Sequence, residues 1–264
     1  MNNNHHQSSI LSRWASGIIS NQKAFTGSCI ILFFALTATF LPFFIHSPSD
    51  FLGTPLSPPS SEYIFGTNGQ GQDVFSQTIC GARQTLFVGF SAGILVVIIG
   101  GLIGGIAGFY GGRMDDILSL LINVFLVMPG LPLMVILASW LPPSPGTLLG
   151  VLVLTGWAWN ARVIRSQMMT FKNRDFVSAA ILSGESNIRI IVVEIMPRML
   201  SLLASAFIGA SIYAIGAQVG LEFLGLGDVS IVTWGTNLYW ASNDLALLTE
   251  SWWTFVPTGL SIAI

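Results

Sequence analysis

Charged residues are scarce in this chain. Only 10 Lys+Arg and 12 Asp+Glu occur among 264 residues, so charged residues make up 8% of the sequence, against roughly 25% in soluble domains. The mean hydropathy is +0.73, and the apolar residues fall in long blocks, as in segments that face lipid. This composition excludes an ordinary soluble enzyme and predicts an integral membrane protein. The net charge of −2 and the absence of a long basic run also exclude nucleic acid as an expected partner.

Residues that carry chemistry are equally few. Two cysteines, Cys29 and Cys80, cannot form a disulfide scaffold or a four-ligand zinc site. The three histidines, His5, His6 and His46, lie in polar segments and form no convergent catalytic or metal-binding set. The sequence contains no G-x-x-x-x-G-K-[ST] phosphate-binding loop. We therefore expect no catalytic residue, no metal and no cofactor in this chain.

Five apolar stretches are long enough to cross about 30 Å of hydrocarbon. They follow a polar leader, 1–24. The first apolar stretch is longer than the hydrophobic region of a signal peptide, so we predict an uncleaved membrane span. A sixth stretch, 251–264, supplies about 21 Å of helix, so we expect the sequence to stop within the membrane as a truncated chain. The predicted fold class is an all-α, six-helix transmembrane bundle with an incomplete last helix. The five complete spans are predicted at 25–45, 86–110, 117–140, 141–160 and 199–220.

The basic residues predict the orientation of these spans. With the N-terminus in the cytoplasm, the loops 46–83 and 223–250 are external, and Arg83 is the one basic residue outside. This asymmetry follows the positive-inside rule. The other nine are Arg13, Lys23, Arg113, Arg162, Arg165, Lys172, Arg174, Arg189 and Arg198.

The segment 162–198 joins the fourth and fifth predicted spans. A short helix is expected to end near Ser183, with Gly184 supplying a turn of positive φ before a second helix. Ser178, Ala179 and Ala180 would allow close approach of a partner backbone. On these residues alone, a solvated basic loop that only sets the topology remains an equal alternative.

The stretch Asp175-Phe176-Val177-Ser178-Ala179-Ala180-Ile181-Leu182-Ser183-Gly184-Glu185-Ser186, followed by Ile195-Met196-Pro197, resembles the EAA loop of bacterial ABC importer permeases. In that family the loop presents a coupling helix to the ATP-binding subunit. Ser178 stands where the family usually has Glu. The coupling residues that this resemblance implies are Asp175, Phe176, Ser178, Ala179, Ala180, Gly184, Glu185 and Pro197.

Three further stretches resemble the dipeptide, oligopeptide and nickel branch of these permeases. The segment from Phe65 to Arg83 is similar to a signature of that branch, with Gln72 and Gln77 in place of arginines. The other two are Gly108-Phe109-Tyr110-Gly111-Gly112-Arg113-Met114-Asp115, and Glu222-Phe223-Leu224-Gly225-Leu226-Gly227 with Trp234-Gly235.

The resemblance implies a permease subunit of an ATP-driven, binding-protein-dependent importer in the bacterial inner membrane. It implies a second homologous permease, two cytoplasmic ATPase subunits that bind ATP and Mg, and an extracytoplasmic solute-binding protein as partners. The implied mechanism is alternating access, and the implied cargo is a peptide, with oligosaccharides and nickel as alternatives.

Small residues and prolines supply candidate packing and pore residues. Gly100, Gly104 and Gly108 recur at intervals of four in the second span, which permits close helix packing or a sliding helix seam. Pro129 and Pro132 are expected to kink the third span, freeing carbonyls for a neighbour or a substrate.

Gln218 and Glu222 lie four residues apart and would share one helix face. Glu222 is either a functional carboxyl at membrane depth or a solvated residue at the interface. The alternative function is a secondary transporter driven by an ion gradient, which would need more ionisable residues near the midplane. A membrane hydrolase would need a nucleophile and a base within the spans.

Overall fold

The computed structural model describes residues 21–264, and this part of the chain contains helices and no strand. His5, His6, Arg13 and most of the predicted leader lie outside the described residues. The helices are α2 (Gln22–Phe40), η1 (Leu41–Phe43), α3 (Val74–Tyr110), α4 (Gly112–Val127), α5 (Gly130–Trp140), α6 (Pro145–Lys172), α7 (Asp175–Leu182), α8 (Asn187–Arg189), η2 (Ile190–Ile195), η3 (Met196–Met199), α9 (Leu200–Phe223), α10 (Trp234–Asn243), η4 (Trp252–Thr254) and α11 (Val256–Ala263).

Each of the five predicted spans overlaps a helix or a helix pair that is apolar enough to cross a membrane. Four are single candidate spans, at Gln22–Phe43, Val74–Tyr110, Pro145–Lys172 and Asn187–Phe223. The fifth is the pair α4 and α5, which is bent by 84° at its break. The chain is therefore a multi-pass helical membrane protein.

Several helix boundaries differ from the sequence-based expectation. Helix α3 begins at Val74, inside the predicted loop 46–83, because the Asp73 carboxylate accepts hydrogen bonds from the Phe75 and Ser76 backbone nitrogens. Helix α6 begins after Ser144, whose hydroxyl accepts from the Thr147 nitrogen, and continues to Lys172. The predicted segment 162–198 thus starts within a helix, and the predicted loop 223–250 contains α10.

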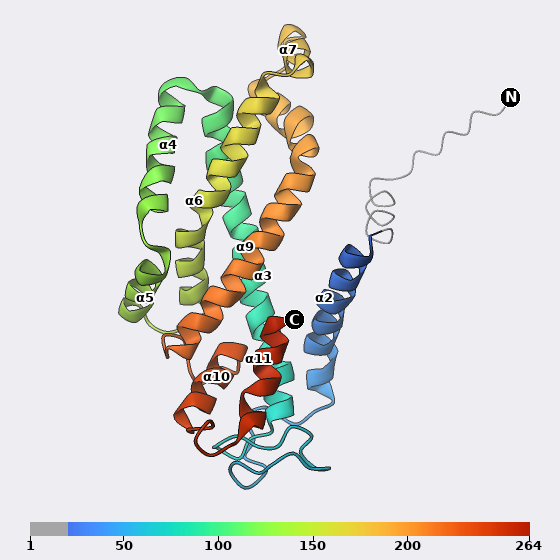
Figure 1. Cartoon of the computed structure of the whole chain (residues 1–264). Helices are drawn as coiled ribbons and strands as arrows, with labels where there is room; N and C mark the ends of the chain where they lie inside the picture. Colours follow the sequence, from blue (N-terminus) through green and yellow to red (C-terminus); the bar gives the residue numbers. More distant parts are fainter. Residues whose placement is uncertain (1–20) are drawn as a thin grey trace, which may run out of the picture.

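Helix α3 lies at the centre of the bundle and packs against α6 and α9 (Figure 1). A β-carbon placed at Gly100 would lie 3.0 Å from the Ala161 backbone nitrogen, and one at Gly108 would lie 2.6 Å from the Arg165 carbonyl oxygen. At Gly104 it would overlap the Ala161 carbonyl. The glycines therefore allow backbone contact between α3 and α6, in agreement with the prediction of close helix packing.

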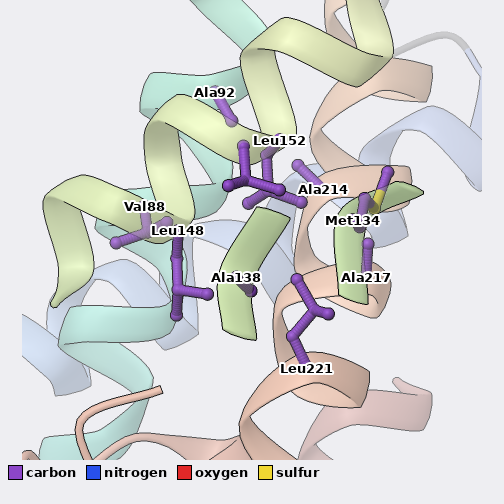
Figure 2. Close-up of a cluster of buried hydrophobic side chains, with 10 residues drawn as sticks. Val88, Ala92, Met134, Ala138, Leu148, Leu152, Ala214, Ala217 and Leu221 are labelled. Carbon is purple, nitrogen blue, oxygen red and sulfur yellow. The ribbon is translucent and has the colours of Figure 1, made fainter. Parts of the chain in front are cut away.

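The apolar core of the bundle joins four helices. Figure 2 shows side chains from α3, α5, α6 and α9 converging, including Val88, Met134, Leu152 and Leu221. This core fixes α5 against the bundle despite the bend before it.

The two ends of the bundle differ. At one end α7 projects beyond the other helices, and we call this the α7 end (Figure 1). At the opposite, α10 end, the segment 46–73 lies near α10 and α11 (Figure 1).

Candidate functional site

Helix α7 has eight residues, with Asp175 in its first turn, where a carboxylate is favoured by the helix dipole. It ends in a glycine turn: Gly184 has φ +78, and the Glu185 nitrogen donates to the Ala180 carbonyl at 3.1 Å. The helix ending near Ser183 and the positive φ of Gly184 are confirmed.

One face of α7 is packed and the other is free. Val177 is fully buried in a cluster with Ile164, Met168, Ile190 and Met199. Leu182 is 88% exposed. This packing holds α7 on the ends of α6 and the helices leading to α9, while an apolar side chain is presented outward.

Arg198 connects α7 to the segment preceding α9. Its guanidinium carbon lies 3.9 Å from the ring centroid of Phe176, and its Nη1 is 3.0 Å from the Glu194 carboxylate. Sequence reasoning assigned Arg198 only to the topology. The available signal was a basic residue directly after Pro197, although spacing alone cannot pair it with Phe176.

The predicted coupling residues occupy two places. Asp175, Phe176, Ser178, Ala179, Ala180, Gly184 and Glu185 lie in α7 and its turn, whereas Pro197 lies in η3. Between them is η2, a π-helical segment, a helix type that is frequent at functional sites. Pro197 lacks a backbone N–H and so interrupts regular helix before α9.

Two arginines of α6 bind α4 near the α7 end. Arg165 forms a two-bond ion pair with Asp115, at 2.5 and 2.6 Å, and Arg162 donates to the Asn123 side chain at 2.7 Å. The assignment of Arg162 and Arg165 to a loop was wrong because α6 continues through both. Asp115, in the polar segment between the second and third predicted spans, was the available signal, although spacing alone cannot pair it with Arg165.

Gln218 and Glu222 are adjacent on α9, as expected from their spacing. Gln218 Nε2 donates to the Glu222 carboxylate at 2.9 Å, and the Thr233 hydroxyl donates to it at 2.6 Å. Glu222 is only 3% exposed, so the alternative of a solvated interfacial residue is wrong. Its contacts attach the N-terminal end of α10 to α9.

Gln72 and Gln77, which replace arginines of the related branch, form a buried polar network. Gln77 Nε2 donates to the Gln72 side chain at 2.6 Å, and Asn68 Nδ2 donates to both side chains. Asn237 of α10 donates to the Gln77 carbonyl at 3.1 Å. Neutral amide side chains thus connect the segment before α3 to the start of α3, which is bonded in turn to α10.

A cavity of about 580 Å³ lies beside the break between α4 and α5. Its wall includes Met128, Gly130 and Leu133 from the break and its surroundings, but neither Pro129 nor Pro132. Pro129 is the N-cap of α5, and Pro132 lies in its first turn. The kink is therefore at 128–129, and Pro132 does not produce a second one.

The other predicted packing and pore residues do not line this cavity. Gly100, Gly104 and Gly108 face α6, and Gln218 and Glu222 face α10. Their proximity to a transport path stays a prediction. Within residues 21–264, no group of three His, Cys, Asp or Glu side chains is placed to hold a metal ion.

Comparison with known proteins identifies the family. The family described as "Binding-protein-dependent transport system inner membrane component" matches residues 100–264. The oligopeptide transport system permease protein OppC of Bacillus subtilis is 33% identical over 258 residues, covering 94% of this chain and 83% of that protein. This chain belongs to the family of binding-protein-dependent transport system inner membrane components.

A second relative and a solved structure agree with this membership. The dipeptide transport system permease protein DppC of Bacillus subtilis is 35% identical over 239 residues, covering 88% of this chain and 73% of that protein. The solved inward-facing MetNI methionine ABC transporter is similar with a TM-score of 0.54 and 16% identity, covering 71% of this chain and 95% of the matched chain. The resemblance to ABC importer permeases is confirmed, and the permease fold is shared.

Proposed function

We propose that this permease forms half of the translocation pore of an ATP-driven peptide importer, and that α7 is its contact with an ATPase subunit. The observation that carries the proposal is the combination of an exposed Leu182 with a buried Val177 on the same short helix. The buried face transmits force to α6 and α9, and the exposed face is free to dock.

The proposed complex contains a second, homologous permease, two ATPase subunits that bind ATP and Mg, and a solute-binding protein. The α7 end then faces the cytoplasm and the α10 end faces outward, with the N-terminus inside, as the positive-inside rule predicts. Peptide cargo is supported by the names of the relatives, which are oligopeptide and dipeptide permeases.

ATP can shift such a pore between inward-open and outward-open states only through contacts that differ between the two states. The α7 surface is where we place these contacts. The packed cluster around Val177 then moves with α7, because close-packed apolar side chains transmit displacement rather than absorb it.

The test is a pair of matched substitutions on exposed leucines, in the complex co-expressed with its ATPase subunits. Leu182→Glu should abolish recovery of the ATPase subunits, or transport-coupled ATP hydrolysis, because it puts a carboxylate in an apolar contact. Leu247→Glu is the control, since Leu247 is 81% exposed but lies beyond α10, at the other end.

Full ATPase recovery and coupled hydrolysis with Leu182→Glu would overturn the α7 assignment. Orientation is tested separately with single cysteines and a membrane-impermeant thiol reagent. Position 182 should be labelled only from the cytoplasmic side and position 247 only from outside, and the reverse pattern would contradict the proposed topology. Isolation of the permease without any ATPase would favour the ion-driven transporter instead.

A further inference from the structure

The cavity beside the break between α4 and α5 combines apolar walls with a few polar groups. It is an open cavity lined by residues of α3, α4, α5, α6 and α9 and of the break itself, and none of its lining residues is charged. Val96, Leu133 and Leu152 supply apolar surface. Its volume of about 580 Å³ lies within the range of small-molecule sites.

Two of the polar side chains in the wall are not engaged elsewhere. Asn160 on α6 is only 8% exposed, and its amide has no hydrogen-bond partner in the described part of the chain. The Tyr213 hydroxyl on α9 likewise has none among residues 21–264. By contrast, Thr155 and Ser205, which also line the cavity, donate to backbone carbonyls of their own helices.

The end of α4 adds further acceptors. Its C-cap, Met128, has extended backbone with ψ 134, so the last carbonyls of α4 lack the next helical turn that would satisfy them. Phe125 and Leu126 of this last turn line the cavity. Within a membrane, such irregular backbone is tolerated where it lines a cavity.

The Asn160 amide lines the cavity and forms no hydrogen bond within the described residues, so it favours a ligand that both donates and accepts hydrogen bonds. The uncharged, mainly apolar wall disfavours a bare metal ion, which needs oxygen ligands around it, and offers too few polar groups for a hydroxyl-rich sugar. Peptide bonds with small apolar side chains fit both features.

We propose that this cavity is a contact site for the backbone of a short peptide during its passage, with Asn160 and Tyr213 as the hydrogen-bonding residues. This inference rests on the proposed importer function and adds a recognition site within the permease itself. The site recognises the backbone amide groups of the peptide rather than side-chain charge, so it accepts peptides of differing sequence.

The test measures ATP-dependent uptake by the complete importer in proteoliposomes, with tri-alanine and, for comparison, cellotriose as probes. Asn160→Leu preserves side-chain size but removes the amide, and Tyr213→Phe removes only the hydroxyl. Tyr110→Phe is the control, because Tyr110 is similarly exposed but lies at the end of α3, outside the cavity wall.

We expect tri-alanine uptake to fall about fivefold with Asn160→Leu and about threefold with Tyr213→Phe, as for loss of one hydrogen bond each. Tyr110→Phe should transport at the unsubstituted rate. A direct readout uses Tyr213→Cys in a Cys29→Ser, Cys80→Ser background, where tri-alanine should slow thiol labelling during turnover and cellotriose should not.

Equal tri-alanine uptake by all three variants, with no protection of the Tyr213→Cys thiol, would overturn the cavity site while leaving the importer function intact. Lack of ATP-dependent tri-alanine uptake by the unsubstituted complex would instead overturn the proposed peptide cargo, and the cavity inference with it. Tyr213→Phe keeps the test decisive if Asn160→Leu fails to fold.

Discussion

The guanidinium of Arg198 stacks on the ring of Phe176, with 3.9 Å between the guanidinium carbon and the ring centroid. This contact joins the first turn of α7 to η3, the short segment directly before α9. Arg198 is therefore a positioning residue, because it ties the proposed coupling helix to a membrane-spanning helix.

Replacing Arg198 should reduce the coupling of transport to ATP hydrolysis more than it reduces the thermal stability of the protein. A cation–π contact at an exposed site contributes about 0.5–1 kcal/mol, so we expect Arg198→Leu to lower the cargo transported per ATP about twofold to fivefold. The melting temperature should hardly change. Arg198→Lys should recover part of the coupling because it keeps the charge. The measurement is uptake and ATP hydrolysis in the same proteoliposomes.

Arg113→Gln is the control for this prediction, because Arg113 is exposed at the start of α4 and forms no salt bridge within the described residues. A parallel loss of uptake and ATP hydrolysis in Arg198→Leu, with no recovery in Arg198→Lys, would contradict a positioning role.

The ion pair between Asp115 and Arg165 should stabilise the packing of α4 on α6. Removing one partner of a fully buried pair costs about 3–5 kcal/mol, but these side chains are partly exposed. We therefore expect a smaller loss, about 1–3 kcal/mol, for Asp115→Leu. The double variant Asp115→Leu, Arg165→Leu should be more stable than the single one, because no unpaired guanidinium remains. Thermal unfolding in detergent of the unsubstituted protein, Asp115→Leu, Arg165→Leu and the double variant measures this cycle.

Arg189→Leu serves as the comparison, since it removes a 3.4 Å pair with Glu185 four residues away; such helix pairs contribute about 0.3–0.5 kcal/mol. If the double variant is no more stable than Asp115→Leu, the two residues do not act as a pair.

Gly104 should be far less replaceable than its near neighbour Gly101. A β-carbon at Gly104 would overlap the Ala161 carbonyl, whereas at Gly101 its nearest neighbour is Ile164 Cδ1 at 3.9 Å. We expect Gly104→Ala to destabilise the protein by about 1–3 kcal/mol through overpacking. Gly101→Ala should be neutral or stabilising by up to about 1 kcal/mol, since Ala favours helix. Melting temperatures of the two variants decide this, and similar values would show that α3 and α6 can separate freely.

The approximate places of the five complete spans followed from local composition, whereas the sixth predicted stretch, 251–264, contains only the short helices η4 and α11. A span must be apolar over the thickness of the bilayer, which makes it visible in contiguous residues. The turn after α7 could also be predicted from the local sequence, because Gly184 adopts a positive φ that most residues avoid. The family followed from short motifs in a fixed order.

Helix ends and side-chain partners were decided by tertiary structure. The continuation of α6 through Arg162 and Arg165 moved one boundary, because both arginines find partners on α4. The start of α3 at Val74 was set locally, by the Asp73 cap. Hydropathy assigns such polar residues to loops.

The pairings that carry the proposals connect residues far apart in the chain. Spacing predicted that Gln218 and Glu222 share a face, but only packing shows that Glu222 binds Thr233 of the next segment and not the cavity. Asn160 and Tyr213 meet at one cavity because α6 and α9 both border the break between α4 and α5. The sequence by itself determined which long segments are apolar enough to cross a membrane, since that depends on neighbouring residues. The packed bundle decided which of their faces meet, since that depends on how the helices lie against one another.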